Sequence, residues 1–305
     1  MERIKEALEK AREERLRAGG SGSISGGTSG GATAVDQITY VHTRTEEVPA
    51  SFLREMRVIT AIEPGGFTDA YGILRTQVLQ RLREKQQNVL AVTSPGVAEG
   101  KTITAINLAI SLAMEVDYTV LLVDADLRNP RVHTYFGIHP KKGLSDYLLD
   151  DVSLPELLVH PSGIGRFVIL PGGRPLDNSS EMLNSPKMIR LVEELKTRYR
   201  SRIVLFDLPP LLSTADALAF SPYVDAALLV VEEGVTPALE IERAAQLLTQ
   251  NAQLIGTVLN KARTAKEHNR QAARAFDHLR GNGMIGAFGK KLQAWMSRFG
   301  GQERE

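Results

Sequence analysis

The chain has 305 residues, a hydrophobic content of 43% and a net charge of +1, so one large core is expected and the whole molecule offers no electrostatic argument for binding nucleic acid or a membrane. Cysteine is absent, which excludes disulfides, thiolate catalysis and Cys-ligated metal. No apolar run approaches the roughly 20 residues of a spanning helix, and the charged N-terminus lacks the apolar stretch of a secretory signal, so we expect a cytoplasmic protein.

The first 50 residues predict a helix followed by a flexible linker. Residues 1–17 carry charges between apolar side chains at helical spacing: Ile4, Ala7, Leu8 and Ala11. Residues 18–50 begin with the Gly/Ser-rich run AGGSGSISGGTSGGATA, whose composition is typical of a linker. A helix separated from the main body in this way indicates a docking element, and a solvated, frayed end is the alternative.

Residues 51–281 show the alternating pattern of an α/β domain. A helix is predicted over about 67–84, and six apolar runs then predict strands: NVLAVTS, TVLLVDAD, RFVILPGG, RIVLFDLPP, AALLVVEE and LIGTVLNKA. Three segments between them predict helices: ITAINLAISLAMEV, MIRLVEELKTRY and ALEIERAAQLLTQ. Because the strand runs are continuously apolar, we expect a mostly parallel sheet sandwiched by helices.

The stretch TSPGVAEGKTITAINLA, residues 93–109, predicts a phosphate-binding loop that opens a helix. Lys101 would reach the β- and γ-phosphates, and the Thr102 hydroxyl would ligate Mg²⁺. The strict pattern G-x-x-x-x-G-K needs glycine at position 95, where Pro95 stands, and Gly96 comes one residue later. The alternative is a helix that begins with Gly100-Lys101-Thr102 by chance and binds no phosphate. The other residues expected to contact the nucleotide are Val97, Ala98, Glu99, Gly100 and Ile103.

Acidic residues follow two further strands at the edge where open α/β sheets bind ligands. Asp124 and Asp126 end TVLLVDAD, and in an extended chain two such residues point the same way and can address one metal. Asp207 ends RIVLFD. A single aspartate here is often a turn former or helix cap, but three beside one phosphate loop indicate a magnesium–nucleotide site. Asn260 ends the last strand, where its amide could read the adenine edge or simply form a turn.

No other site competes in the sequence. The six histidines show no metal-ligand spacing, and no Gly-x-Ser-x-Gly elbow occurs. Trp295 is the only tryptophan, which argues against aromatic platforms for nucleic acid, so no nucleic-acid partner is expected.

Residues 282–305 form a basic tail. Between Lys261 and Glu305 there are ten Lys/Arg and four Asp/Glu. Segment 284–299 has apolar side chains on one helical face: Phe288, Leu292, Trp295, Met296 and Phe299. A basic amphipathic helix of this composition is typical of segments that lie on an anionic membrane surface. A helix packed on the domain is the alternative.

Residues 67–262 resemble the cytoplasmic ATPase domain of bacterial tyrosine autokinases (BY-kinases), which accompany exopolysaccharide and capsule synthesis. The resemblance lies in the phosphate loop and in DADLRNPRVHTYFGI, KKGLSDYLLDD, LPGGRPLDNSSEMLNSPKM and IVLFDLPPLLSTADAL. The family's loop also carries extra residues before its GK[ST], which explains the displaced glycine. The N-terminal helix and linker resemble the variant that pairs the kinase with a separate integral-membrane polysaccharide co-polymerase.

The resemblance implies a P-loop NTPase fold of the deviant Walker type, with ATP and Mg²⁺ as cofactors. Lys101 and Thr102 match its phosphate-loop pair. Asp124 would orient or deprotonate the attacking hydroxyl, Asp126 would organise Mg²⁺, and Asp207 would hold a metal-bound water. The metal ligands are thus Thr102, Asp126 and Asp207. Arg128 would contact phosphate or a neighbouring subunit in a homo-oligomer, and catalysis is in-line phosphoryl transfer by positioning and charge neutralisation.

Two departures from the family pattern change what we expect of the activity. Family members end in a tyrosine cluster that is the phosphorylation substrate, whereas here the last tyrosine is Tyr223. The family's oligomerisation helix carries Glu-x-x-Arg-x-x-Arg, whereas DAYGILR has Asp69, Gly72 and Arg75. We therefore expect ATP hydrolysis that regulates polysaccharide polymerisation or export at the inner face of the plasma membrane, with Tyr71 or a partner's tyrosine as the alternative acceptor.

Two other functions stay open on the sequence alone. One is a non-catalytic adaptor gated by nucleotide, which the full set of acids argues against. The other is a spatial-positioning ATPase of the septum or partition type. Those proteins carry a second lysine early in the phosphate loop, whereas SPGVAEGK has only Lys101.

Overall fold

The computed structural model describes residues 43–59, 66–198 and 201–262. The predicted helix 1–17 and the predicted tail 282–305 lie outside these residues. No helix in the described part of the chain combines the length and apolar character needed to cross a membrane. The predicted linker 18–50 ends too late, because its last residues already belong to the folded domain and include a strand.

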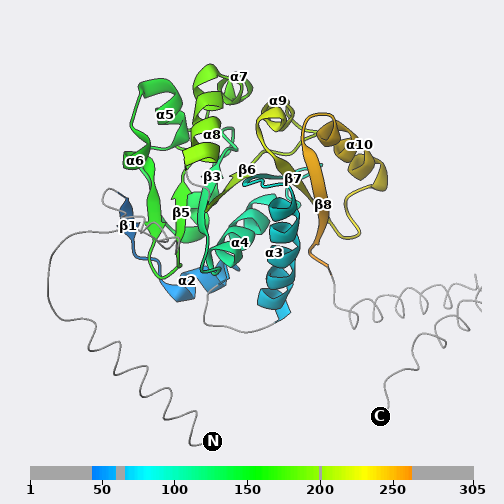
Figure 1. Ribbon diagram of the computed structural model, residues 1–305, viewed down its shortest axis with the longest axis horizontal. Coiled ribbons are helices and arrows are strands. Elements are labelled where there is room, and N and C mark those ends of the chain that lie inside the picture. The colour runs from blue at the N-terminus through cyan, green and yellow to red at the C-terminus, as the bar shows by residue number, and fades with distance from the viewer. Residues whose placement is uncertain (1–42, 60–65, 199–200, 263–305) are drawn as a thin grey trace, which may run out of the picture. The chain divides into compact units, whose positions relative to one another are not determined.

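Eight strands form one sheet in the order β1-β4-β5-β3-β6-β2-β7-β8 (Figure 1). All six predicted strands are present, and neighbouring strands pair in parallel except for β4 and β5, which are antiparallel. The expectation of a mostly parallel sheet is thereby confirmed. The strands are β1 (Arg44–Glu46), β2 (Val89–Thr93), β3 (Thr119–Asp124), β4 (Val159–Pro161), β5 (Phe167–Leu170), β6 (Arg202–Asp207), β7 (Ala226–Glu232) and β8 (Gln253–Asn260).

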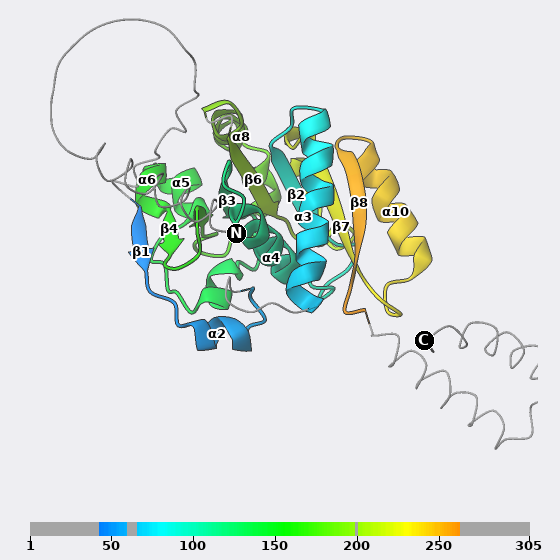
Figure 2. The ribbon, with the colours of Figure 1, turned by 60° about the horizontal axis from the view of Figure 1, so that its bottom comes forward.

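Helices cover both faces of this sheet (Figure 1 and Figure 2). One face carries α2 (Ala50–Glu55), α3 (Gly66–Glu84), α4 (Lys101–Ala113) and the 3-10 helix η1 (Val132–Phe136). The opposite face carries α5 (Leu144–Asp150), α6 (Leu154–Leu157), α7 (Ser179–Leu183), α8 (Pro186–Arg198), α9 (Asp216–Phe220) and α10 (Ala238–Thr249), with the short η2 (Ser221–Tyr223) after α9.

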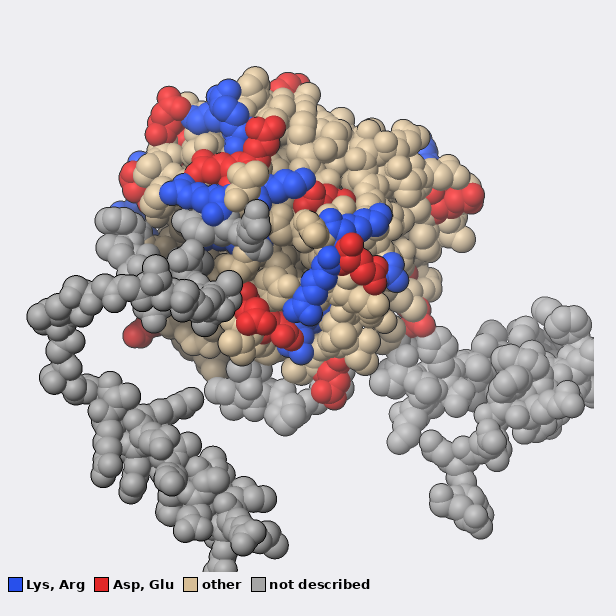
Figure 3. Space-filling model, in the orientation of Figure 1, with Lys and Arg blue, Asp and Glu red and all other residues tan. Residues whose placement is uncertain are grey.

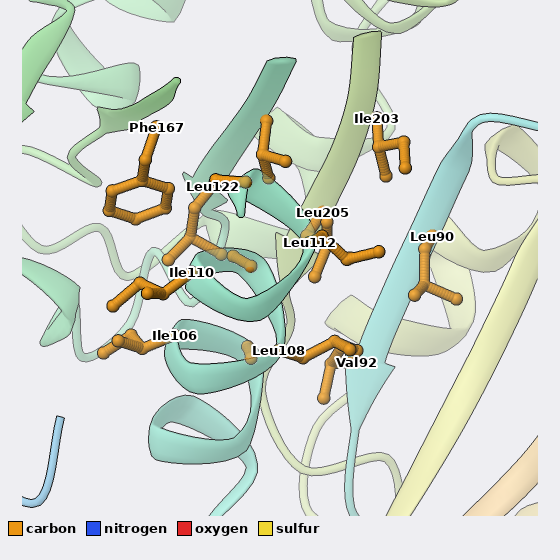
Figure 4. Packing of buried hydrophobic residues seen from close by; sticks show 14 of the residues in the cluster. Leu90, Val92, Ile106, Leu108, Ile110, Leu112, Leu122, Phe167, Ile203 and Leu205 are labelled. Carbon is orange, nitrogen blue, oxygen red and sulfur yellow. The ribbon is translucent and has the colours of Figure 1, made fainter. Parts of the chain in front are cut away.

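Alternation along each strand divides the core into two layers. In β2, Leu90 and Val92 face α3 and α4, whereas Val89 and Ala91 face the other helices. Both sets are fully buried, which is why the strand reads as a continuous apolar run. Figure 4 shows side chains of α4 packed against β2, β3, β5 and β6.

Helix α4 is the central element of the first layer. Its residues from Thr104 to Ala113 are all buried, because the helix lies between the sheet and α3. Two of its polar side chains anchor neighbouring segments. Asn107 accepts a hydrogen bond from Ile59 N–H at 2.8 Å and donates to the Arg57 carbonyl at 3.0 Å, and the Ser111 hydroxyl donates to the Tyr71 carbonyl at 3.3 Å. Because α4 is packed on all sides, it also holds the phosphate loop that precedes it in place.

Tyr71 is buried, and a tyrosine that accepts a phosphoryl group must be accessible. The expectation that Tyr71 is an alternative acceptor is therefore wrong for this structure. Its side chain is 8% exposed, with its ring edge-on to Phe67 at 5.2 Å. Burial raises the pKa of its hydroxyl, which also contacts Thr104 and Asn107.

Arg75 also turns inward, toward α4 and the segment that follows it. Its guanidinium donates to the Ser111 carbonyl at 3.1 Å and pairs with Glu115 at 3.0 Å. Arg75 is therefore engaged within its own chain. On the face shown in Figure 3, basic and acidic side chains are intermixed.

Candidate active site

The three predicted site segments follow three neighbouring strands. β6 pairs with β2 on one side and with β3 on the other, so the loops after β2, β3 and β6 meet at one edge of the sheet. Asp124 and Asp207 are register partners across the last rung of β3 and β6. The parallel ladder thus places two of the predicted acids side by side before any side-chain contact is considered.

The phosphate loop turns sharply into α4. Gly100 has φ of 91° and lies in the left-handed region, immediately before Lys101, the first residue of the helix. Ala98 also has a positive φ, 62°. A Cβ at position 100 would lie 2.0 Å from Asn260 Nδ2, so both the backbone angle and the space require glycine there. The first turn of α4 therefore presents its free N–H groups toward the loop, as anion sites do.

Lys101 and Thr102 hold the acidic groups of the other two loops. Lys101 Nζ donates to Asp126 Oδ2 at 2.8 Å, to Thr102 Oγ1 at 3.2 Å and to Asp207 Oδ1 at 3.5 Å. Thr102 Oγ1 donates to Asp207 Oδ2 at 2.7 Å. The structure thus brings together four of the residues predicted for catalysis and metal binding: Lys101, Thr102, Asp126 and Asp207.

Asp124 lies beside this group in a different environment. Its Oδ2 accepts from Val132 N–H at 2.9 Å, and its buried Oδ1 has no hydrogen-bond partner among the described residues. Strand β3 ends at Asp124, so Asp126 belongs to the following loop, where its Oδ1 accepts from Asn129 N–H at 3.2 Å. The two acids are therefore not a simple extended pair, as the sequence pattern had suggested.

Burial dominates the electrostatics of the site. It raises the pKa of the Asp124 carboxyl well above its ordinary value, and the neighbouring Asp207 raises it further. Burial also raises the pKa of Asp207, although Lys101 and Thr102 oppose this shift. For Lys101, burial lowers the pKa, but Asp207 and Asp126 outweigh it and the pKa is raised. Lys101 is therefore the cation that compensates this acidic cluster.

A cavity of about 430 Å³ opens next to the cluster. Seven of the predicted contact residues line it: Val97, Ala98, Gly100, Lys101, Thr102, Asp126 and Arg128. Gly96, Glu99, Ile103, Asp124, Asp207 and Asn260 lie outside its wall. Arg128 reaches the cavity while its Nε donates to Asp216 on α9.

Glu99 and Asn260 face the outer side of the phosphate loop. The Glu99 carboxylate accepts from Gly96 N–H at 3.1 Å and from Thr236 Oγ1 at 2.6 Å. Asn260 Nδ2 donates to the Glu99 carbonyl at 2.8 Å. Lys261 Nζ donates to the Ala98 carbonyl at 2.9 Å and pairs with Glu232 at 2.6 Å. These bonds fasten the loop to the turn after β7 and to the end of β8.

Sequence reasoning missed several residues of the site. Those that line the cavity are Asn129, Arg131, Tyr135, Pro209, Pro210, Ser213 and Thr214. Most of them follow the predicted acids within a few positions, so the whole loops after Asp126 and Asp207 could have been included. Thr236 offered no such signal, because it lies more than 130 residues from the Glu99 side chain that it contacts.

The donor set fits Mg²⁺ bound together with a nucleotide rather than by protein alone. Within the described residues, no three His, Cys, Asp or Glu side chains converge closely enough to enclose a metal. Mg²⁺ commonly takes only one or two carboxylates and completes its shell with water and substrate phosphates. Thr102, Asp126 and Asp207 supply such a partial set, and the unpartnered Asp124 Oδ1 adds a further acceptor nearby.

Comparison with known proteins bears on this site. Residues 90–288 match the family described as the CobQ/CobB/MinD/ParA nucleotide binding domain. Tyrosine-protein kinase YwqD of Bacillus subtilis (strain 168) is 33% identical over 214 residues, which cover 70% of this chain and 89% of that protein. Tyrosine-protein kinase etk of Escherichia coli (strain K12) is 33% identical over 193 residues, which cover 63% of this chain and only 26% of that protein.

The solved kinase domain of Escherichia coli tyrosine kinase ETK has the same fold. It superposes with a TM-score of 0.60 and 29% identity, covering 73% of this chain and 90% of that domain. The likeness thus extends to a complete kinase domain and is not confined to the phosphate loop. This chain is a nucleotide-binding P-loop protein that belongs to the bacterial tyrosine kinase (BY-kinase) family.

Proposed function

We propose that this protein binds magnesium–ATP in the cavity beside Lys101 and catalyses in-line transfer of the terminal phosphoryl group, to water or to a tyrosine hydroxyl. The observation that carries the proposal is the cluster that Lys101, Thr102 and Asp126 form with the buried Asp207, because the first three of these residues line an open cavity. A pure structural ion cluster would not need a glycine-rich loop and a helix N-terminus at the same place.

The chain's own residues divide the work as follows. The N–H groups of the loop and of the first turn of α4 bind the phosphate oxygens, and Lys101 exchanges its carboxylate partners for the β- and γ-phosphates. Asp124 orients the attacking hydroxyl and accepts its proton, a role that fits a buried carboxyl with a raised pKa and a free oxygen. Arg128 contacts phosphate from the opposite loop, and the Asn260 amide remains a candidate for the adenine edge.

Thr102, Asp126 and Asp207 would hold Mg²⁺. The bound ion would neutralise charge on the phosphates, which is its usual contribution to phosphoryl transfer. Lys101 now pairs with Asp126 and Asp207, and a cation held by these two carboxylates would leave Lys101 available for the nucleotide phosphates.

Incubation of the purified protein with γ-labelled ATP and Mg²⁺ tests the proposal. Labelled tyrosine identifies a kinase, and free labelled phosphate alone identifies an ATPase. Lys101→Met should abolish either signal, because the loop then loses its phosphate-binding cation. If ATP binds but neither product forms, the protein is a nucleotide-gated adaptor, in which ATP binding alone shifts an interface, or it needs an activator that the assay lacks.

We also propose that the protein works in exopolysaccharide or capsule assembly with an integral-membrane co-polymerase. The support is the family membership, together with the predicted docking helix 1–17 on its linker. Co-purification of the full chain with such a membrane protein, lost when residues 1–17 are removed, would support this setting. Retained co-purification would assign the contact to another part of the chain.

The predicted tail offers a second route to the membrane surface. Removal of the residues after Asn282 should abolish sedimentation with anionic liposomes, because segment 284–299 carries the basic amphipathic pattern. Unchanged sedimentation would discard this role for the segment. Either result leaves the proposed chemistry at Lys101 untouched.

A further inference from the structure

A buried carboxylate connects the two loops that form opposite walls of the nucleotide cavity. Asp216 is the first residue of α9 and is 0% exposed. Arg128 Nε, from the loop after β3, donates to its two oxygens at 3.1 and 3.3 Å. The hydroxyl of Ser179, which is also fully buried, donates to the same carboxylate. A buried charge needs such partners, because its desolvation is otherwise costly.

Arg128 extends from this buried network to the cavity. Its side chain is 43% exposed and lines the cavity together with Lys101 and Thr102. Nε is occupied by Asp216, whereas Nη1 and Nη2 form no hydrogen bond with the described residues. Because a guanidinium is planar, fixing its Nε edge also fixes the direction of the remaining donors. A surface arginine that only solubilised the protein would not need a fully buried anchor.

The opposite wall is anchored by the same group. The segment between β6 and α9 supplies Pro209, Pro210, Ser213 and Thr214 to the cavity and ends at Asp216. The loop after β3 supplies Asp126, Arg128 and Asn129. The Arg128–Asp216 pair therefore sets the distance between the two loops as well as the direction of the guanidinium.

We propose that Asp216, supported by Ser179, is a positioning residue that holds Arg128 so that its Nη groups bind the terminal phosphate of ATP. The inference rests on the proposed function, because it assumes ATP in this cavity. Lysine at position 128 keeps the charge but cannot present the Nε edge and two further donors at once. Asparagine at position 216 offers one acceptor where the carboxylate offers two, so the guanidinium loses half of its anchor.

Nucleotide affinity measured by calorimetry with Mg²⁺ separates this role from a merely structural one. Arg128→Lys and Asp216→Asn should each weaken a non-hydrolysable ATP analogue about 10-fold, while ADP changes less than about 2-fold, because ADP lacks the terminal phosphate. The double variant should be no worse than Arg128→Lys alone, since the two residues act through one contact. Arg174→Lys and Asp150→Asn are matched controls, because that pair, at 2.8 Å, is exposed and lies outside the cavity.

Unchanged discrimination between the ATP analogue and ADP in Arg128→Lys would overturn the proposal. So would Asp216→Asn that lowers only the unfolding temperature, or additive losses in the double variant. If the wild-type protein bound neither nucleotide, the proposed function would fail and this inference with it. Wild-type binding with unaltered discrimination in the variants would remove this inference alone.

Discussion

Asp124 and Asp207 are register partners at the ends of two adjacent parallel strands, and both carboxyl groups are buried. Lys101 and Thr102 form hydrogen bonds with Asp207, at 3.5 and 2.7 Å. Asp124 has one oxygen on the Val132 N–H and one without a partner. The site therefore holds a buried carboxyl group that the protein satisfies only in part, and such local costs in stability are common at functional sites.

Asp124→Asn is expected to stabilise the nucleotide-free protein and to abolish phosphoryl transfer. The amide keeps an acceptor for Val132 N–H and removes the like charge beside Asp207, which we expect to raise the free energy of unfolding at neutral pH by about 1–2 kcal/mol. Denaturant unfolding and the labelled-ATP assay measure the two effects. Loss of activity with lowered stability would show that Asp124 stabilises the fold instead.

The stability gained by Asp124→Asn should depend on pH. Burial raises the pKa of Asp124 in the folded state, so between its unfolded value near 4 and its folded value the native protein binds more protons than the unfolded one. The contribution of this group is therefore fully present below about pH 4 and is lost as pH rises through the folded pKa. The raised pKa of Lys101 acts only at alkaline pH.

Unfolding curves of the wild-type and Asp124→Asn proteins across pH 4 to 9 measure this dependence. The difference between them should be small at the acidic end, grow with rising pH and then level off. Burial also raises the pKa of Asp207, and because this group lies beside Asp124, the difference reports the two carboxyl groups together. A difference that is constant across the range would contradict the assignment.

Glu99 should control the shape of the phosphate loop without touching the nucleotide. Its carboxylate joins Gly96 N–H to the Thr236 hydroxyl at 3.1 and 2.6 Å. Glu99→Ala should weaken nucleotide binding about 10-fold, because it removes the hydrogen bonds to both Gly96 and Thr236. Thr236→Val should have a smaller effect in the same direction, because it removes only the second of these bonds. Thr249→Val is a matched control, since that hydroxyl donates to the Gln246 carbonyl and both residues are exposed on α10. Equal affinities for all variants would show that the loop keeps its shape unaided.

The six longer strands were predictable because each is a buried apolar run, and the phosphate loop was predictable because its residues are consecutive. β1 and β4 were missed because strands of three residues carry no usable periodicity. The environments of Asp124 and Asp126 could not be read from their spacing, since the strand ends at the first of them. Partners such as Asp216 and Thr236 are brought to the site only by the order of the strands, which local sequence does not encode.

Gly100→Ala should cost both stability and nucleotide binding. Alanine is strained at φ of 91°, and its Cβ would lie 2.0 Å from Asn260 Nδ2. We expect a loss of about 1–3 kcal/mol in the free energy of unfolding. Asn260→Ala in the same chain should recover only part of it, because the second change removes the clash and leaves the backbone strain.

Gly72→Ala is the matched control for this prediction. Gly72 lies inside α3, and an added Cβ would meet nothing within 4 Å apart from its chain neighbours and the backbone of its own helix. Alanine there should stabilise the protein by about 0.5–1 kcal/mol, because it restricts the unfolded chain and favours the helix. Thermal unfolding and nucleotide titration are measured for the wild-type protein, Gly100→Ala, the double variant Gly100→Ala/Asn260→Ala and Gly72→Ala. Together they separate the effect on stability from the effect on nucleotide binding. Gly100→Ala that binds nucleotide normally would mean that the loop adopts another conformation around the phosphates than the one seen beside Asn260.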